Sequence, residues 1–175
     1  AGKFDLLSRS SPYAPIAGAL REHARDLLAS TEEQAARLGR ELNAALFPIG
    51  QVLVDLVPEL GLLLGPQPAV PELEPAEAHN RFVLAFQSLL GVLATPAHPL
   101  VLFLDDLQWA DPASLRLLQA LLTAPRRGHL LVVGAYRERE VDAAHPLTAT
   151  MAKLREAGAP VTEIALGPLD APTVG

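Results

Sequence analysis

The first half of the chain carries apolar residues at helical spacing. Between residues 11 and 29 they recur at intervals of three and four, which predicts a helix with one buried face; these residues are Tyr13, Ile16, Ala17, Leu20, Ala24, Leu27 and Leu28. Overlapping capping boxes in residues 30–34 predict a second helix that ends near Leu46, before Pro48. A short apolar helix is expected over 49–57 and a long one over 76–94, with a proline-rich surface connection between them.

The second half alternates between apolar runs and helical patterns. Residues 99–104 form an uninterrupted apolar run that ends at Asp105, which suits a strand over 99–105 buried on both faces of a parallel sheet. Asp111 as N-cap and Pro112 at the first helical position predict a helix over 112–123. A strand at 129–136, a helix at 146–157 and a strand at 161–166 are expected to follow, and residues 2–6 predict a short early strand. The expected fold class is therefore α/β, with right-handed βαβ units in a parallel sheet flanked by helices.

Two adjacent carboxylates end the apolar run at 99–105. Asp105 and Asp106 stand where the strand gives way to a loop and helix, and parallel sheets bind ligands beyond the carboxyl ends of their strands. An acidic pair at that point can hold Mg²⁺ and orient a water molecule, as the Walker B element of a P-loop nucleotide hydrolase does. The alternative is that both residues only cap the following turn.

The phosphate-binding loop that normally accompanies such a pair is not in this sequence. No Gly-x-x-x-x-Gly-Lys-Ser/Thr occurs in the 175 residues, and Gly2-Lys3 is followed by Phe4. The pair could then be a false match, part of a degenerate NTPase, or part of a truncated one. Truncation at both ends is favoured, because the chain starts at Ala1 and Asp170-Ala171-Pro172 predicts a helix start just before Gly175. In that case the missing strand should leave a gap or an exposed apolar edge in the sheet.

Composition narrows the function classes. Half of the residues are hydrophobic, which is ample for one domain core, and the formal net charge of −6 disfavours direct nucleic-acid binding. The absence of cysteine excludes disulfides and cysteine-based metal sites or catalysis. No apolar run approaches the length of a membrane span and no signal peptide precedes the first helix, so a cytoplasmic location without membrane contact is expected.

A family resemblance follows from the acidic segment and the next strand. Residues 101–111, Val-Leu-Phe-Leu-Asp-Asp-Leu-Gln-Trp-Ala-Asp, together with Gly134-Ala135-Tyr136-Arg137, resemble the STAND-type, AAA-related predicted ATPases. These are modules of large bacterial signalling proteins such as hybrid serine/threonine–histidine multi-kinases, and of ATP-dependent transcription regulators. Segments 2–5, 50–60 and 78–82 extend the similarity over nearly the whole chain. The sequence departs from the pattern at Glu138-Arg139, where relatives tend to have Asp-Asn.

The resemblance implies roles for three residues. Asp105 would hold Mg²⁺, Asp106 would polarise the attacking water, and Arg137 would sense the γ-phosphate; an ion pair with Glu138 or Glu140 is the equally weighted alternative for this arginine. Asp111 is assigned to helix capping and Trp109 to packing. The five histidines, which are His23, His79, His98, His129 and His145, lack metal-ligand spacing and are treated as non-catalytic.

The sequence therefore predicts a partial ATPase domain over residues 1–175, with a mainly helical part at 1–98 and a βαβαβ part at 99–175. Its expected function is an ATP-driven regulatory switch that uses Mg²⁺ and acts on other domains of a signalling chain, with an ATP-dependent oligomer among its partners. The parent protein would hydrolyse ATP, while this fragment alone would be inactive. The alternatives are a non-enzymatic, degenerate NTPase scaffold and the equivalent module of an ATP-dependent transcription regulator.

Overall fold

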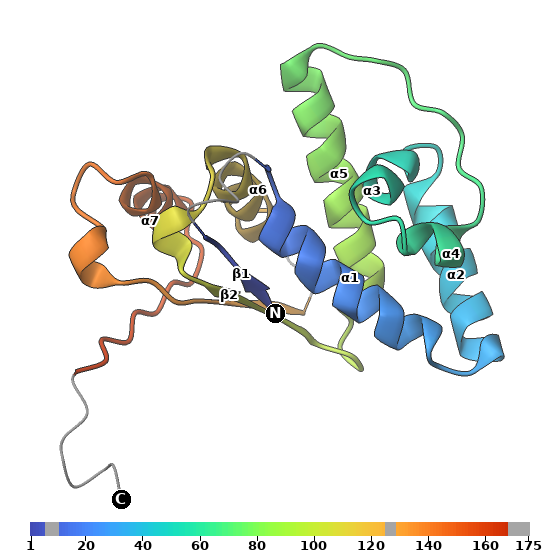
Figure 1. Cartoon of the computed structure of the whole chain (residues 1–175), viewed down its shortest axis with the longest axis horizontal. Coiled ribbons are helices and arrows are strands. Elements are labelled where there is room, and N and C mark those ends of the chain that lie inside the picture. The colour runs from blue at the N-terminus through green and yellow to red at the C-terminus, as the bar shows by residue number, and fades with distance from the viewer. Residues whose placement is uncertain (6–10, 125–128, 168–175) are drawn as a thin grey trace, which may run out of the picture.

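A computed structural model describes residues 1–5, 11–124 and 129–167 of the chain (Figure 1). The helices are α1 (Ala14–Leu28), α2 (Glu32–Leu46), α3 (Gln51–Leu56), α4 (Leu60–Leu64), α5 (Pro75–Leu93), α6 (Pro112–Leu122) and α7 (Pro146–Glu156). The strands are β1 (Gly2–Lys3), β2 (Leu100–Asp105) and β3 (Leu130–Gly134), and two 3-10 turns, η2 (Leu107–Trp109) and η3 (Glu138–Glu140), follow β2 and β3. Helices α1 to α5 gather on one side of the molecule, and α6 and α7 lie on the other (Figure 1).

The helix boundaries largely follow the predicted signals. Thr31 accepts a hydrogen bond from the Gln34 N–H while the Gln34 side chain accepts one from the Thr31 N–H, so the predicted capping box starts α2. Asp111 caps α6 by accepting from the N–H groups of Ala113 and Ser114, as predicted. The apolar helix expected over 49–57 is shorter, at α3, and α4 is an additional helix that the periodicity did not reveal because it spans a single turn.

The three strands form one parallel sheet in the order β1-β2-β3. Leu100 to Leu104 of β2 stand opposite Leu130 to Gly134 of β3, and Lys3 of β1 stands opposite Asp105. The predicted parallel arrangement of the strands at 99–105 and 129–136 is therefore confirmed. The early strand expected at 2–6 is present at Gly2–Lys3, and Leu6 lies outside the described residues, as does the predicted helix start at Asp170.

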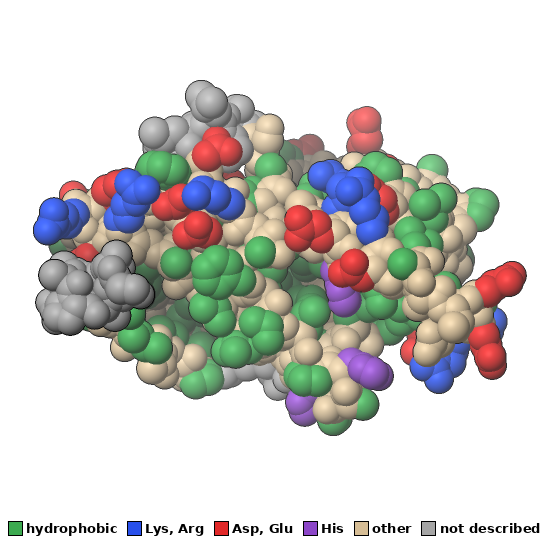
Figure 2. Space-filling model, turned by 60° about the horizontal axis from the view of Figure 1, so that its bottom comes forward, with side chains coloured by type: hydrophobic (Ala, Val, Ile, Leu, Met, Phe, Trp, Pro, Cys, Tyr) green, Lys and Arg blue, Asp and Glu red, His purple; other side chains and the backbone are tan. Residues whose placement is uncertain are grey.

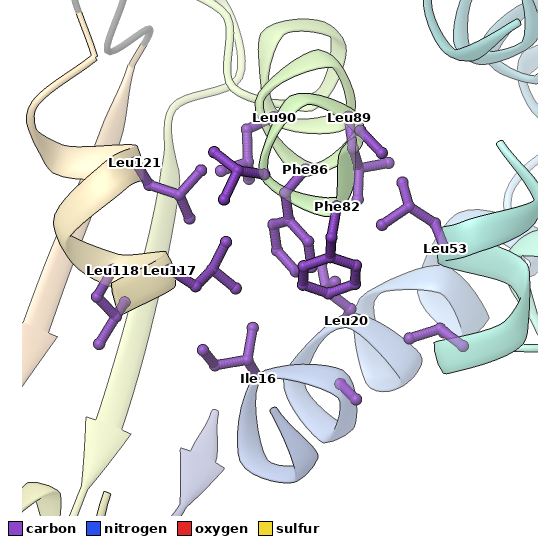
Figure 3. Close-up of a cluster of buried hydrophobic side chains, with 14 of the residues drawn as sticks. Ile16, Leu20, Leu53, Phe82, Phe86, Leu89, Leu90, Leu117, Leu118 and Leu121 are labelled. Carbon is purple, nitrogen blue, oxygen red and sulfur yellow. The ribbon is translucent and has the colours of Figure 1, made fainter. Parts of the chain in front are cut away.

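The core that supports this sheet is centred on α5. Phe86 and Leu89 of α5 are at most 1% exposed and meet side chains from α1, α3 and α6 (Figure 3). The centroid of the Phe82 ring lies 5.3 Å from the ring centroid of Phe86 and 4.5 Å from that of Tyr13. Leu104, near the end of β2, is fully buried in the same cluster. The carboxyl end of β2 is thus anchored through its alternate side chains to a rigid core.

The other face of the sheet is open in the described part of the chain. Val101 is 59% exposed, Leu131 beside it 57%, and Phe103 and Val133 are also exposed. Figure 2 shows hydrophobic side chains gathered on this lower side of the molecule. The prediction that the 99–105 strand is buried on both faces is therefore wrong, since helices cover only one. Of the two outcomes expected for a missing strand, the structure shows no gap, because the three described strands are contiguous; the exposed apolar edge stays a prediction.

The predicted strand at 161–166 is a further correction. Residues 160–167 follow α7 without regular structure, and Ile164 and Leu166 are 81% and 91% exposed. Arg155 of α7 pairs with Glu163 at 2.7 Å, so this segment lies beside the helix that precedes it. A segment with strand-like composition becomes a strand only where a neighbouring strand supplies hydrogen-bonding partners, and none of the described strands pairs with residues 160–167.

Among the described residues, no helix is long and apolar enough to cross a membrane.

Candidate functional site: an acidic pair at the carboxyl edge of the sheet

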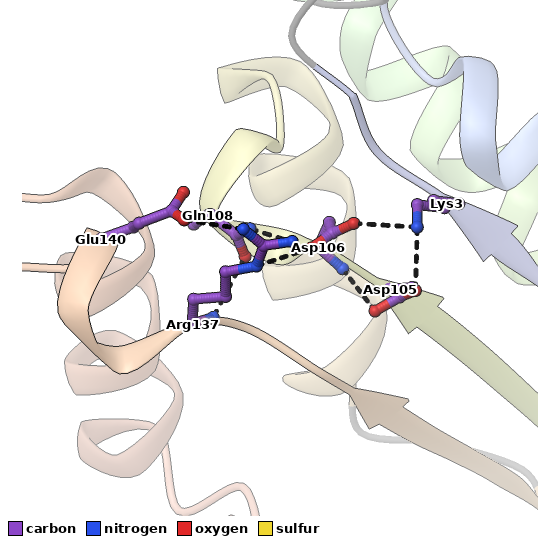
Figure 4. A network of polar contacts seen from close by, with 6 residues as sticks. All are labelled: Lys3, Asp105, Asp106, Gln108, Arg137 and Glu140. Atoms are coloured by element: carbon purple, nitrogen blue, oxygen red, sulfur yellow. Dashed lines mark hydrogen bonds and ion pairs between the residues drawn. The ribbon is translucent and has the colours of Figure 1, made fainter.

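The predicted site residues meet at one edge of the sheet. Asp105 is the last residue of β2, Asp106 follows it, and Arg137 comes three residues after β3. Because β2 and β3 are parallel, their carboxyl ends point the same way, and Nε of Arg137 lies 3.8 Å from Oδ1 of Asp106 (Figure 4). The expectation that Asp105 and Arg137 share one edge is confirmed.

The backbone turns sharply at the acidic pair. Asp106 has φ 54° and ψ 43°, in the left-handed region where Asp is among the residues most readily tolerated. Oδ1 of Asp105 accepts a hydrogen bond from the Asp106 N–H at 2.9 Å, which supports the turn. Such conformations persist where the surrounding structure fixes them, and they cluster at functional sites.

Packing of η2 against β3 holds the turn in place. The Leu107 N–H donates to the Ala135 carbonyl at 2.9 Å. A Cβ atom on Gly134 would meet Cδ1 of Leu107, so a larger residue there would require the Leu107 side chain to shift. Gly134 thus allows η2 to pack closely against the end of β3, beside the two carboxylates.

Gln108 links the acidic pair to the segment after β3. Its side chain is 1% exposed; Nε2 donates to Oδ1 of Asp106 at 2.9 Å, and Oε1 accepts from the Arg137 N–H at 3.2 Å. Its carbonyl oxygen lies 3.1 Å from Nε2 of His145, whose Nδ1 accepts from the Leu147 N–H at the start of α7. A fully buried glutamine thus connects β2, β3 and α7.

Lys3 reaches the same carboxylates from β1. Its Nζ lies 3.2 Å from Oδ2 of Asp106 and 3.6 Å from Oδ2 of Asp105 (Figure 4). The Lys3 side chain is 66% exposed, whereas that of Asp106 is 9% exposed. The acidic pair is therefore held between a lysine on one side and a buried amide on the other.

Electrostatics keep the site charged at neutral pH. Hydrogen bonds from Gln108 and then Lys3 favour the carboxylate form of Asp106 and hold its pKa below the ordinary value, although burial acts in the opposite direction. The same pair raises the pKa of the Lys3 ammonium, chiefly through its hydrogen bond to Asp106 and the attraction of both carboxylates. Asp106 is thus an anion over the physiological range.

Arg137 forms the ion pair with Glu140 that was the alternative to a phosphate-sensing role, and the sensing role stays a prediction. Its Nη1 pairs with Glu140 at 3.2 Å, and its guanidinium carbon lies 5.7 Å from the centroid of the Trp109 ring. The side chain is nevertheless 62% exposed and close to Asp106. Trp109 is half-buried against the core, in line with its assignment to packing.

Asp111 belongs to a separate buried network. Besides capping α6, it accepts from the Ser114 hydroxyl, and Ser114 Oγ accepts in turn from the Tyr13 N–H at 3.2 Å. Asp111 is 5% and Ser114 0% exposed. This arrangement fixes α6 against the start of α1, so the predicted structural role of Asp111 is confirmed.

Two carboxylates suit a metal that is shared with a phosphate. Among the described residues, no three His, Cys, Asp or Glu side chains are placed to form an all-protein metal site. Mg²⁺, however, is commonly held by one or two carboxylates together with water and substrate phosphates. Asp105 and Asp106 already share a cation, the Lys3 ammonium, so their charge and placement fit such a role.

A parallel sheet flanked by helices, with charged side chains at its carboxyl edge, defines an α/β domain of the P-loop NTPase-like class. The chain belongs to the AAA ATPase domain family, whose model matches residues 1–133. It is 39% identical over 125 residues to the hybrid signal transduction histidine kinase G of Dictyostelium discoideum. That alignment covers 69% of this chain but only 4% of the kinase, so the chain spans a small part of that protein. No solved structure matches the chain.

Sequence reasoning did not assign Lys3 or Gln108 to the site. Gln108 lies inside the motif at 101–111, but its role depends on the burial of its amide between β2 and β3. Lys3 was considered only as a failed phosphate-loop lysine. The register that brings it to Asp105 joins residues about a hundred positions apart, and a single sequence carries no local signal for that pairing.

Proposed function

We propose that this chain forms the metal-binding side of an ATP-hydrolysing switch in a signal-transduction protein. In this proposal Asp105 and Asp106 are the Walker B carboxylates of a nucleotide site. The observation that carries the proposal is the pair of anionic side chains at the carboxyl edge of a parallel sheet, in a chain that belongs to an ATPase domain family.

The two carboxylates have different surroundings, which supports different tasks. Asp105, whose side chain is 38% exposed, holds Mg²⁺ through direct or water-mediated contact. Asp106, which is buried and fixed by Gln108, accepts a hydrogen bond from the attacking water and orients it. The metal, when bound, neutralises the charge that develops between the β- and γ-phosphates. Both tasks require the carboxylates to be charged, and the low pKa of Asp106 favours that state.

Arg137 is proposed to sense the γ-phosphate. Its guanidinium lies at the edge of the site and is mostly exposed, so it can turn from Glu140 towards a bound phosphate. Guanidinium groups bind phosphate oxygens through paired hydrogen bonds. If Arg137 left Glu140 for the phosphate, the nucleotide would change a contact of η3, which precedes α7. A conformational signal could then pass from the nucleotide site to α7.

The site needs a phosphate cradle that the 175 residues do not encode. We propose that residues 1–175 are part of a larger ATPase domain whose Walker A segment precedes Ala1, in a cytoplasmic signalling chain. The similarity to a hybrid histidine kinase supports attachment to kinase or other output domains. The regulated partners are then other domains of the same chain, and nucleotide-dependent oligomerisation is part of the proposal.

A degenerate NTPase scaffold is the second candidate. The open apolar sheet face, with Val101 and Leu131 more than half exposed, favours it because such a face suits a protein contact. Nucleotide binding separates the two candidates, since only the first requires it.

Calorimetry with ATP tests the proposal. We expect the 175-residue chain to bind ATP weakly or not at all, and a longer chain that includes the preceding residues to bind it in a Mg²⁺-dependent way. Asp105→Asn in the longer chain should raise the Mg²⁺ concentration needed for half-maximal hydrolysis. Asp111→Asn is the control, because Asn caps a helix nearly as well as Asp. Micromolar binding by the short chain would contradict the assignment of the phosphate cradle to preceding residues.

A further inference from the structure

The backbone places Lys3 beside the acidic pair with little freedom. Lys3 stands opposite Asp105 in the β1–β2 pairing, and the next residue, Phe4, donates its N–H to the Asp105 carbonyl at 3.0 Å. Phe4 itself is 1% exposed and packs in the core. The register of β1 is therefore fixed on both sides of Lys3, and only the side chain of Lys3 can move.

The Lys3 ammonium lies between both carboxylates. It is 3.2 Å from Oδ2 of Asp106 and 3.6 Å from Oδ2 of Asp105, so one cation serves two anions (Figure 4). Lys3 approaches Oδ2 of each carboxylate, whereas Gln108 and Arg137 approach Oδ1 of Asp106 and the Asp106 N–H approaches Oδ1 of Asp105. The two Oδ2 atoms thus share the Lys3 ammonium.

Arg137 does not take this place. It approaches only Asp106, at 3.8 Å and at Oδ1, and it also pairs with Glu140. Lys3, by contrast, is a compact point charge on a flexible four-carbon stem, and its side chain is 66% exposed. It can leave the carboxylates for solvent without any change in the core.

We propose that Lys3 is a positioning residue that competes with the divalent cation for Asp105, the carboxylate of the pair assigned to the metal, and thereby sets the metal affinity of the site. A metal ion on Asp105 and the Lys3 ammonium beside it would repel each other at contact distance. In the metal-free state Lys3 neutralises the acidic pair and holds it in place. Metal binding displaces the ammonium into solvent. This inference rests on the proposed metal role of the acidic pair.

Removal of the lysine charge should therefore strengthen metal binding. Mg²⁺ alone is titrated into the isotope-labelled 175-residue chain, and the amide signals of Asp105 and Asp106 report local binding by nuclear magnetic resonance. We expect Lys3→Gln to lower the half-saturating Mg²⁺ concentration roughly tenfold, as the loss of a partly exposed competitor implies. A purely structural role for Lys3 would instead weaken binding.

Two control variants isolate the effect. Lys3→Arg keeps the charge and should bind Mg²⁺ as the wild type does. Lys153→Gln removes the same charge from the other lysine of the chain, which lies exposed near the end of α7, and should also match the wild type. If both glutamine variants strengthened binding equally, net charge rather than competition would explain the result and the inference would be overturned.

The wild-type chain provides a further test, which is valid even if the Lys3 variants do not fold. With ¹³C-labelled lysine, the side-chain Cε signal of Lys3 should move towards that of Lys153 as Mg²⁺ saturates the site. Equal Mg²⁺ affinity in wild type and Lys3→Gln would overturn this inference and leave the proposed function standing. If the Asp105 and Asp106 signals did not respond to Mg²⁺ in either chain, both the inference and the metal assignment would fail.

Discussion

The buried amide of Gln108 offers a direct test of how the acidic pair is held. Gln108→Met keeps the length and approximate volume of the side chain but removes its donor and its acceptor. Oδ1 of Asp106 then loses a hydrogen bond of 2.9 Å, and the Arg137 N–H loses its acceptor at 3.2 Å. No water replaces them readily, because the Gln108 side chain is 1% exposed.

The loss of unfolding free energy in Gln108→Met follows from the two groups that lose their partner, Oδ1 of Asp106 and the Arg137 N–H. A hydrogen bond to a charged group contributes about 1.5–3 kcal/mol and a neutral one about 0.5–1.5 kcal/mol. The variant should therefore lose about 2–4.5 kcal/mol of unfolding free energy, a large part of the roughly 5–15 kcal/mol that a domain typically has. The pKa of Asp106 should also rise towards its ordinary value, because Gln108 is the main cause of its depression.

Urea denaturation at neutral pH, followed by circular dichroism, measures the loss. Gln51→Met is the matched control: Gln51 also donates to an aspartate, Asp55, at 2.7 Å, but on the exposed surface of α3. Such a pair contributes only about 0.2–0.5 kcal/mol. If Gln108→Met lost no more stability than Gln51→Met, the buried bridge would not be what fixes Asp106.

Other predictions concern packing and pH. Gly39→Ala in α2 should destabilise the fold, because its Cβ would collide with the Leu63 carbonyl, whereas Gly18→Ala in α1 has open space and should gain up to about 1 kcal/mol; thermal unfolding compares them. The depressed pKa of Asp106 stabilises the fold above the ordinary carboxyl pKa, and this contribution is lost as pH falls through the lower folded-state pKa. In Asp106→Asn the free energy of unfolding should therefore fall less steeply below about pH 4 than in the wild type. An equally steep fall in both proteins would count against this account.

Local signals in the sequence predicted most of the helices and the edge of the sheet that carries the site. The capping box at Thr31 and the N-cap at Asp111 are decided within four residues, so the sequence alone sufficed. The shared edge of Asp105 and Arg137 followed from the rule that parallel strands end together.

Features that depend on distant partners could not be predicted. The segment at 161–166 has strand-like composition, but no described strand pairs with it. The uninterrupted apolar run predicts burial of both faces of β2, yet Val101 and Phe103 lack a covering layer among the described residues. The position of Lys3 depends on the β1–β2 register, which no periodicity encodes.

Hydrolysis by Asp106→Asn, measured in the complete ATPase domain together with ATP affinity, tests the central claim most directly. The substitution keeps the size of the side chain and removes the charge that is proposed to orient the attacking water. We expect steady-state hydrolysis to fall about 10²–10³-fold, as for the loss of one preorganised electrostatic group, while ATP affinity stays nearly unchanged. Full hydrolytic activity in Asp106→Asn, with the variant folded and ATP bound, would contradict the assignment of this carboxylate to catalysis.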